Sequence, residues 1–253
     1  MKAIIIAAGR GVRMGSRGQL TPKGLMRLGE KSMVEDSILT LADHGIRDIC
    51  LVTGHLFDQY HALVETLPVP VEVRHNPDYA TTGSLPSLLI GLKGHAGACV
   101  ILESDLTYEP RALDALDPVQ SRLIVSGTTG AGDEVYVWTR QNAAENHLVQ
   151  LSKDIAAEPS PHFGELVGIT GLTDKAVSAF RAVGTGLAAV NPMTEYETAL
   201  VAMSRDLPVN CVKLDGLAWA EADDENMLKH AQRDVYPRVL AARKLRAATS
   251  AKA

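Results

Sequence analysis

The sequence predicts an α/β fold in which helices cover both faces of a mostly parallel sheet. Short apolar segments typical of buried strands alternate with segments of helical character along most of the chain. The first, Lys2 to Ala8, is rich in Ile and uniformly apolar, as a strand buried on both faces would be. With 253 residues, 46% hydrophobic and 22% charged, the chain can bury a sizeable core. Disorder and fibrous repeats are excluded by the same values.

The elements of the N-terminal half follow in order. Residues 9–31 contain six glycines and four arginines and are expected to form a long loop. Ser32 and Glu35 then form a capping box, which predicts a helix through Ala42 with Gly45 at its stop. Further strands are predicted at 47–53, 70–74, 98–103 and 121–126, and further helices at 56–66 and 84–93.

The pattern changes from about residue 133. Extended segments at 133–140 and 147–153 predict a hairpin, and a third at 163–172 completes an inserted lobe of about 130–172. No Pro-, Gly- or Ser-rich linker divides the chain, so we expect one domain over 1–247 and a fraying tail at 248–253. The remaining expected helices are 173–182, 194–205 and 224–246, and the remaining strands are 209–214 and 217–222.

Charge and cysteine content narrow the class of protein. Twenty-five Lys and Arg against thirty Asp and Glu give a net charge of −5, which argues against a nucleic-acid-binding surface. Cys50, Cys99 and Cys211 are far apart and form no CxxC motif, so neither a disulfide framework nor a zinc site is expected. The apolar N-terminal run is too short for a signal peptide or a membrane span. A cytoplasmic protein without a membrane partner is the expectation.

The segment after the first strand is the most informative part of the chain. It reads AAGRGVRMG from Ala7 to Gly15 and is followed by Thr-Pro-Lys ending at Lys23. In an open parallel sheet, ligands bind beyond the carboxyl ends of the strands. Glycines let backbone N–H groups approach phosphate oxygens, while Arg13 and Lys23 add positive charge. Met14 breaks a GxGxxG pattern and no P-loop is present, so the alternative is an ordinary flexible loop.

Two acidic motifs follow later strands. Asp105 ends the motif ESD after the strand at 98–103, where a carboxylate suits a hard cation such as Mg²⁺. Asp223 and Asp224 end the motif WAEADD, and a second carboxylate beside Asp105 would complete a metal site. The alternatives are a loop cap at Asp105 and a helix N-cap at one of the later pair. The sequence leaves open whether Asp223 or Asp224 is the second ligand.

On these motifs, and over nearly the whole chain, the sequence resembles nucleotidyltransferases of the sugar-1-phosphate/phosphocholine type. The resemblance implies a Rossmann-like, nucleotide-diphospho-sugar transferase fold. It also implies that Arg13 and Lys23 act on the triphosphate as catalytic residues and that Asp105 and Asp223 hold Mg²⁺. A helix N-cap at Ser84 is a further reading of the segment at 76–84. The nucleotide-binding residues implied are Ala7, Ala8, Gly9, Gly11, Thr82, Gly83, Ser84 and Ser104.

Three later segments, 132–138, 151–154 and 164–169, are similar to the subgroup that cytidylylates phosphonates and phosphocholine. Bacterial phosphonate cytidylyltransferases match best. Lys153 would neutralise the acceptor's phosphonate, unless it is a surface lysine between two strands. Aromatic residues make up only 4% and Pro86 stands where relatives place an aromatic residue, which weakens a choline acceptor. The acceptor-binding residues implied are Lys153, Glu165, Tyr196 and Glu197.

The expected activity is therefore transfer of CMP from CTP to a small phosphonate, with release of pyrophosphate, in phosphonate biosynthesis. The acceptor would be of the 2-aminoethyl-, 2-hydroxyethyl- or carboxy-phosphonate type and the cofactor Mg²⁺. Because such an acceptor is already anionic, positioning and charge neutralisation would suffice without a general base. The alternatives are a sugar-1-phosphate or phosphocholine nucleotidyltransferase and a nucleotide-binding regulatory module. The base, the acceptor and the oligomeric state stay open, although the hairpin near 133–152 could support a homodimer.

Overall fold

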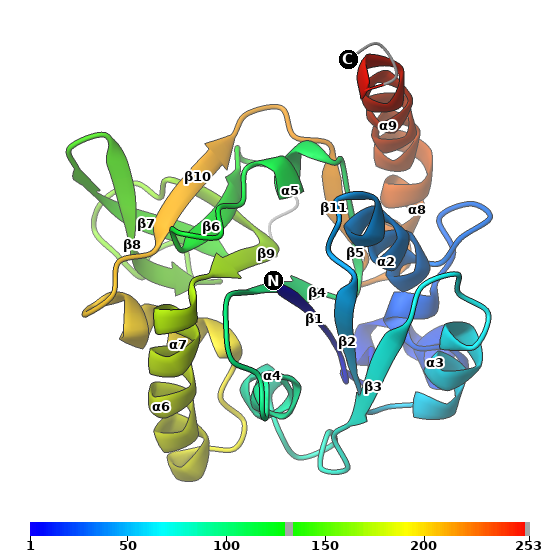
Figure 1. Cartoon of the computed structure of the whole chain (residues 1–253), viewed down its shortest axis with the longest axis horizontal. Helices are drawn as coiled ribbons and strands as arrows, with labels where there is room; N and C mark the ends of the chain where they lie inside the picture. The colour runs from blue at the N-terminus through cyan, green and yellow to red at the C-terminus, as the bar shows by residue number, and fades with distance from the viewer. Residues whose placement is uncertain (130–133, 251–253) are drawn as a thin grey trace.

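The computed structural model describes residues 1–129 and 134–250 (Figure 1). Its centre is a nine-stranded sheet with the strand order β3-β2-β1-β4-β9-β6-β10-β8-β7. The predicted strands are confirmed, each within about three residues of the expected bounds. They are β1 (Lys2–Ala7), β2 (Asp48–Thr53), β3 (Val71–His75), β4 (Cys99–Glu103), β6 (Arg122–Ser126), β7 (Tyr136–Asn142), β8 (Glu145–Ser152), β9 (Gly164–Leu172) and β10 (Asn210–Leu214).

The two halves of the sheet differ in strand direction. Strands β3, β2, β1 and β4 are parallel, as expected. Beyond β4 the sheet is mixed, because β9 runs antiparallel to β4 and β6, while β10 is parallel to β6. β7 also pairs with β9, so the strands on the left of Figure 1 curl around onto themselves. The parallel character expected for the sheet is therefore concentrated in its N-terminal half.

The segment expected as one inserted lobe is divided between two places. β7 and β8 form the expected antiparallel hairpin at the end of the sheet. β9, in contrast, is a central strand, and all nine of its residues are buried. Apart from Glu165 and Thr170, its residues are apolar or glycine, as is typical of a strand covered on both faces. Residues 130–133, at the start of the expected lobe, lie outside the described part of the chain.

Helices cover both faces of the sheet, as predicted. α4 (Ser84–Leu92), α6 (Asp174–Val190) and α7 (Tyr196–Ser204) share one apolar cluster with one side of the strands. α2 (Met33–Asp43) and α3 (Phe57–Val64) share a second cluster with the other side. The capping box of Ser32 and Glu35 is present at the start of α2. α6 runs eight residues beyond its expected end at residue 182.

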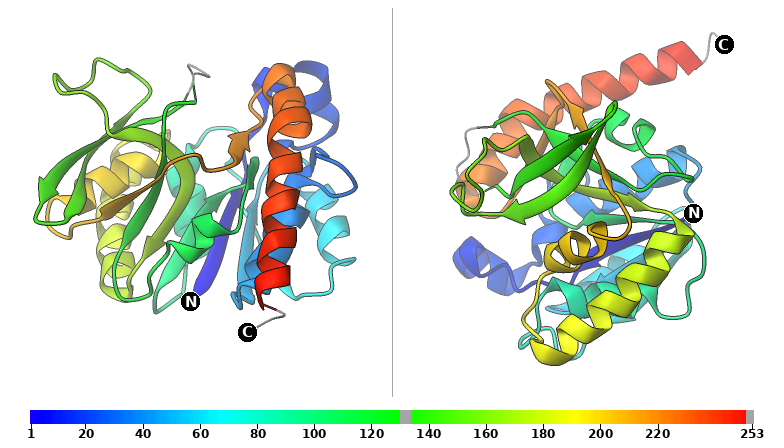
Figure 2. Two further views of the ribbon diagram at one scale, coloured as in Figure 1. Left: turned by 90° about the horizontal axis from the view of Figure 1, so that it is seen from above. Right: turned by 90° about the vertical axis from the view of Figure 1, so that its left-hand side faces the viewer.

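The C-terminal segment forms a continuous helical stretch. α8 (Glu225–His230) passes through a π-helical turn at Ala231–Val235 into α9 (Tyr236–Ser250). Figure 2 shows this stretch along the outside of the molecule beside the N-terminal segment. Arg243 binds both carboxylate oxygens of Asp36 on α2, each at 2.6 Å. The helix extends through residue 250, four residues beyond its expected end at residue 246.

Several short elements were absent from the sequence prediction. The expected loop at 9–31 contains 3-10 turns at Val12–Met14 and Lys23–Leu25 and the helix α1 (Gly15–Leu20). α5 (Arg111–Asp114) was also missed. The short strand β5 (Leu106–Tyr108) was missed too. It pairs antiparallel with β11 (Trp219–Glu221), which lies within the strand predicted at 217–222, and this pairing positions much of the site described below.

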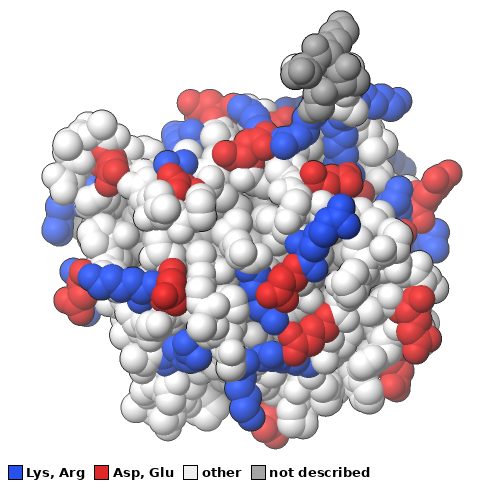
Figure 3. All heavy atoms as spheres, in the orientation of Figure 1, with Lys and Arg blue, Asp and Glu red and all other residues white. Residues whose placement is uncertain are grey.

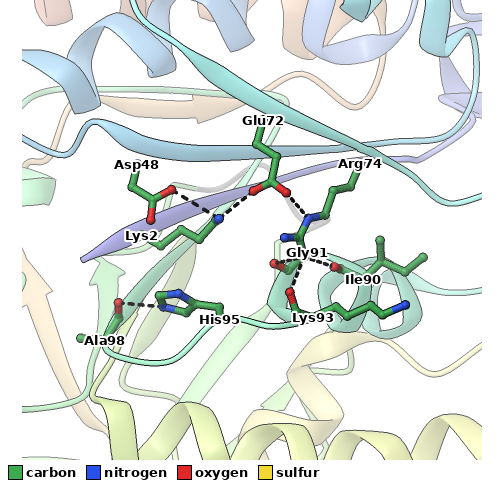
Figure 4. A network of polar contacts seen from close by, with 9 residues as sticks. All are labelled: Lys2, Asp48, Glu72, Arg74, Ile90, Gly91, Lys93, His95 and Ala98. Carbon is green, nitrogen blue, oxygen red and sulfur yellow. Dashed lines mark hydrogen bonds and ion pairs between the residues drawn. The ribbon is translucent and has the colours of Figure 1, made fainter.

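A polar network fixes the end of α4 that lies away from the cavity (Figure 4). Lys2 on β1 pairs with Asp48 at 3.3 Å and with Glu72 at 2.7 Å. Arg74 binds Glu72 at 2.7 Å and donates to carbonyls at the C-terminal end of α4, among them that of Ile90 at 2.8 Å. The network thus anchors the C-terminal end of α4, while its N-terminal end, at Ser84, points toward the site.

Three further expectations from the sequence concern disulfide bonds, membrane-spanning helices and a basic surface. All three cysteines are free and buried, so the expectation of no disulfide holds for them. Within the described residues, none of the helices has the length and apolar character needed to cross a bilayer. On the face drawn in Figure 3, acidic and basic side chains are interspersed rather than gathered into one broad basic surface.

Candidate active site

A cavity of about 550 Å³ opens where the carboxyl ends of β1 and β4 meet the glycine-rich segment and the N-terminal ends of α4 and α7. This is the edge of the sheet at which the sequence places the ligand. Most of the expected site residues line it: Ala8, Gly9, Arg13, Lys23, Thr82, Gly83, Ser84, Ser104, Asp105, Lys153, Tyr196, Glu197 and Asp223.

Three expected site residues do not line the cavity. Ala7 is buried within β1 at 2% exposure. Gly11 has a φ of +59°, and a Cβ there would lie 2.9 Å from the Cγ of Lys23, so it shapes the segment that carries the lysine. Glu165 is buried in β9 and accepts the backbone N–H of Thr129 at 2.8 Å. The role expected of Glu165 as a direct acceptor ligand has no geometric support.

Charged groups of opposite sign meet at the floor of the cavity. The ammonium of Lys23 forms ion pairs with both Asp105 and Asp223, and Arg13 also pairs with Asp223. The side chains of the two aspartates are 10% and 7% exposed. Burial disfavours the charge on Lys23, but the two carboxylates outweigh it and raise its pKa well above the ordinary value. Burial likewise opposes ionisation of Asp223, yet Lys23 and Arg13 hold its pKa below the ordinary value.

The pairing of β5 with β11 brings the two acidic motifs together. The backbone N–H of Ala222 donates to the carbonyl of Asp105 at 3.1 Å, which sets Asp223 beside Asp105. The next residue, Asp224, is the N-cap of α8, where its carboxylate accepts the N–H groups of Asn226 and Met227 at 2.7 and 2.8 Å. Of the two residues between which the sequence left the choice open, Asp223 lines the cavity and Asp224 caps the helix.

The aspartate pair suits a hard divalent cation. Oxygen atoms of Asp105 and Asp223 surround the same ammonium, so they converge on one point. Mg²⁺ commonly takes one or two protein carboxylates and completes its shell with substrate phosphates and water. Across residues 1–129 and 134–250 there is no group of three or more His, Cys, Asp or Glu arranged for a metal, so two carboxylates are the protein donor set. That set fits Mg²⁺ bound together with a nucleotide.

The segment before α4 is held against α7. The N–H and the hydroxyl of Ser84 both donate to Glu195, at 2.8 and 2.5 Å, and Tyr196 donates its N–H to the Ser84 hydroxyl at 2.9 Å. The residue that caps α4 is Gly83, so the reading of Ser84 as the N-cap is wrong. A Cβ at Gly83 would come within 2.4 Å of the carbonyl of Thr194, which is why the close approach of these segments needs glycine there.

Several carboxyl groups in and around the cavity escaped the sequence analysis. Glu103 and Glu221 line it together with Glu197, and Glu134 is buried close by. Burial, followed by Glu197 and Asp105, raises the pKa of Glu103 to about 8, although the hydroxyl of Tyr196 donates to its carboxylate at 2.5 Å. Glu103 and Glu221 end the two strands that precede Asp105 and Asp223, which was the available signal.

Glu134 and Glu197 each have one buried carboxylate oxygen without a hydrogen bond in the described part of the chain. Burial raises the pKa of each to about 7, and in both cases the charge of Lys153 works against that rise. Lys153 lines the same part of the cavity, as the sequence predicted. Lys153 could thus bind an anionic group of a ligand. A cationic group of the same ligand would provide hydrogen bonds for the buried oxygens of Glu134 and Glu197.

Residues 3–121 match the family model described as the MobA-like NTP transferase domain. A choline-phosphate cytidylyltransferase of Streptococcus pneumoniae is 36% identical over 101 residues, which cover 40% of this chain and 43% of that protein. A 2-aminoethylphosphonate cytidylyltransferase of Lancefieldella rimae is 35% identical over 116 residues, 43% of this chain and 47% of the relative.

A third relative is the CMP-5'-(3-aminopropyl)phosphonate synthase of Streptomyces rubellomurinus, 29% identical over 118 residues, 46% of this chain and 19% of that protein. The matches therefore span less than half the length of each of these three curated relatives.

Solved structures resemble nearly the whole chain. A CTP:phosphocholine cytidylyltransferase from Streptococcus pneumoniae has a TM-score of 0.73 at 18% identity, covering 91% of this chain and 97% of its own. The inositol-1-phosphate CTP transferase from T. maritima has a TM-score of 0.74 at 18% identity, covering 92% and 97%. An apo UDP-glucose pyrophosphorylase reaches 0.77 at 11% identity, covering 94% and 98%. These likenesses confirm the nucleotide-diphospho-sugar transferase fold that the sequence predicted.

Proposed function

Starting from the MobA-like NTP transferase match over residues 3–121, we propose that this chain is a cytidylyltransferase that transfers CMP from CTP to a small phosphonate. The observation that carries the proposal is the placement of Lys23 between Asp105 and Asp223, with Arg13 beside them, at the floor of one cavity. A regulatory module that only binds nucleotide has no need of two carboxylates beside the phosphate-binding cations. Two of the relatives are named as cytidylyltransferases, which supports the choice of cytidine.

The proposed reaction is an in-line displacement at the α-phosphorus of CTP. An oxygen of the acceptor's phosphonate forms the new bond to phosphorus, and the bond from that phosphorus to the oxygen bridging the β-phosphate breaks. Pyrophosphate leaves with the bonding electron pair. The attacking oxygen is anionic near neutral pH, so no proton has to be removed and the protein mainly positions two anions and neutralises their charge.

The cavity residues divide that work. The triphosphate would draw Lys23 and Arg13 from the carboxylates that they now contact, because the phosphates carry the greater negative charge. Asp105 and Asp223 would then be left to hold Mg²⁺, which when bound supplies Lewis-acid polarisation of phosphate oxygens. Lys153, which lines the same cavity, would neutralise the phosphonate of the acceptor.

The buried carboxyl groups favour an aminoalkylphosphonate among the three acceptor types expected from the sequence. An ammonium group would provide partners for the unsatisfied oxygens of Glu134 and Glu197 and would favour ionisation of Glu103. A carboxylate at the same place would add repulsion to an already acidic wall. The names of two relatives, which act on or make aminoalkylphosphonates, point the same way.

Phosphocholine is the second candidate, because it offers the same arrangement of an anion and a cation and Tyr79 and Tyr196 line the cavity. Product formation followed by ³¹P NMR separates the two. The panel is CTP and Mg²⁺ with 2-aminoethyl-, 2-hydroxyethyl- or carboxymethyl-phosphonate, phosphocholine or glucose-1-phosphate, each at equal concentration. We expect the aminoalkyl acceptor to form the new phosphonate–phosphate anhydride faster than the other acceptors do. Preferred turnover of glucose-1-phosphate would overturn the acceptor assignment, and preference for the carboxymethyl compound would overturn the argument from the acidic wall.

A further inference from the structure

A buried tyrosine lies directly beneath the charged floor of the cavity. Tyr60, on α3, is 1% exposed and belongs to the apolar cluster on that face of the sheet. Its hydroxyl lies against Gly24, beside the end of β4 at Ser104. A Cβ at Gly24 would lie 2.9 Å from this hydroxyl and 3.0 Å from the carbonyl of Ser104. Three chain segments therefore converge on one phenolic oxygen.

The two residues beside the Tyr60 hydroxyl, Gly24 and Ser104, are the immediate neighbours of an ion pair in the site. Gly24 follows Lys23, and Ser104 precedes Asp105. The Lys23 segment and the end of β4 are far apart in sequence, and neither belongs to the element that carries Tyr60. Burial raises the pKa of the Tyr60 hydroxyl, so the group stays protonated and can act as a donor as well as an acceptor. One side chain thus ties both halves of the Lys23–Asp105 pair to the core.

The rest of the same segment holds the glycine-rich region at further points. The backbone N–H of His55 donates to the carbonyl of Ala8 at 3.4 Å, and its ring Nε2 donates to the carbonyl of Gly18 at 3.0 Å. The Gln59 side-chain amide donates to the carbonyl of Leu20 at 2.8 Å. The region between β1 and α2 is therefore held by His55, which lies between β2 and α3, and by the first turn of α3, where Tyr60 lies against Gly24, next to Lys23.

We propose that Tyr60 is a positioning residue of the nucleotidyl transfer, which holds Lys23 opposite Asp105 through Gly24 and Ser104. The inference rests on the proposed function. Tyr60 touches neither the cavity nor a reacting group, so its effect is on geometry. Displacement of a catalytic charge by about 1 Å costs on the order of 100-fold in rate, and loss of this hydroxyl relaxes two such charges.

The test compares Tyr60→Phe with Tyr108→Phe. Tyr108, on β5, is equally buried in the same apolar cluster and is not among the cavity-lining residues, so it controls for loss of a core hydroxyl. With CTP and the best acceptor, we expect Tyr60→Phe to lower kcat by about 10- to 100-fold while the KM for CTP stays near the wild-type value. Tyr108→Phe should keep the wild-type kcat.

A second measurement reports on Lys23 without turnover. In ¹⁵N-labelled protein, the ammonium N–H signal of an ion-paired, shielded lysine exchanges slowly enough to observe, and Lys23→Met identifies it by its loss. We expect this signal to shift or broaden in Tyr60→Phe and to stay in place in Tyr108→Phe. Equal behaviour of the two Phe variants in both kcat and the Lys23 signal would overturn the inference. If the wild type turns over no acceptor, the proposed function fails, and the signal alone still decides whether Tyr60 positions Lys23.

Discussion

Replacing Lys23 by Met tests whether its ammonium holds the two aspartates together. The substitution keeps the apolar stem but leaves Asp105 and Asp223 buried, with side-chain exposures of 10% and 7%, and Arg13 as the cation on Asp223. Removing one partner of a buried ion pair costs about 3–5 kcal/mol, and the contact of Arg13 places this case near 3. In a domain of this size, that loss lowers Tm by about 6–12 °C.

The assay is urea unfolding at neutral pH with and without Mg²⁺, with the exposed Lys93→Met as the matched control. We expect Mg²⁺ to stabilise Lys23→Met more than the wild type, because the cation can occupy the place of the ammonium. The dependence of the unfolding free energy on pH in the acidic range should change too. Asp223 contributes stability above its unfolded pKa of about 3.9, and that contribution disappears as the pH falls through its lower folded pKa. Equal stability of the two Met variants, with no added response to Mg²⁺, would refute this reasoning.

Three further predictions use other parts of the molecule. Asp223→Asn should lower Mg²⁺-dependent pyrophosphate release by at least about 100-fold, whereas Asp224→Asn should retain it, because Asp224 caps α8; equal losses would contradict the assignment. Glu103→Gln should raise Tm relative to the wild type more at pH 9 than at pH 5. The pKa of Glu103 is about 8 in the folded protein and about 4.3 in the unfolded chain. The cost of ionising Glu103 on folding therefore grows as the pH rises above about 4.3. A gain in Tm that does not depend on pH would argue against a protonated Glu103. Ser32→Ala should cost about 1 kcal/mol in urea unfolding with unchanged kcat, and a loss of kcat would show that the capping box also supports the site.

The sequence predicts the fold well wherever one segment carries its own signal. The apolar run of β1 and the capping box at Ser32 are local patterns, and both elements form within a residue of their expected bounds. Helix α6 continues past its expected end at residue 182 and through Gly184. Gly184 is in fact a packing position, where a Cβ would lie 3.1 Å from Leu85 on α4. Helix–helix contact thus overrides the local preference of glycine.

The sequence predicted the motif residues of the site but missed several of its buried glutamates. Recognisable motifs contain Arg13, Lys23 and Asp105. In the structure all three line one cavity together with Asp223, and ion pairs join them. Glu221 was missed because it reaches the cavity only through the pairing of β11 with β5, two strands of three residues each. Strands that short show no periodicity, so their partners cannot be read from the sequence.

The burial of Lys23 is the clearest case in which structure changes a sequence-based expectation. In a glycine-rich loop, a lysine carries little folding energy, and its loss would affect turnover alone. With its side chain 20% exposed between two buried carboxylates, the same residue contributes to stability as well. The sequence supplies the residue type, and the 3-10 turn at Lys23–Leu25, packed on Tyr60, supplies its position.

The central claim is that this cavity transfers a cytidylyl group with the help of Mg²⁺. The most direct measurement is pyrophosphate release with each of the four ribonucleoside triphosphates, with 2-aminoethylphosphonate present or absent and with Mg²⁺ or EDTA. We predict release only when CTP, the acceptor and Mg²⁺ are all present. Release from UTP in preference to CTP, release that does not depend on the acceptor, or release that continues in EDTA would each contradict the account.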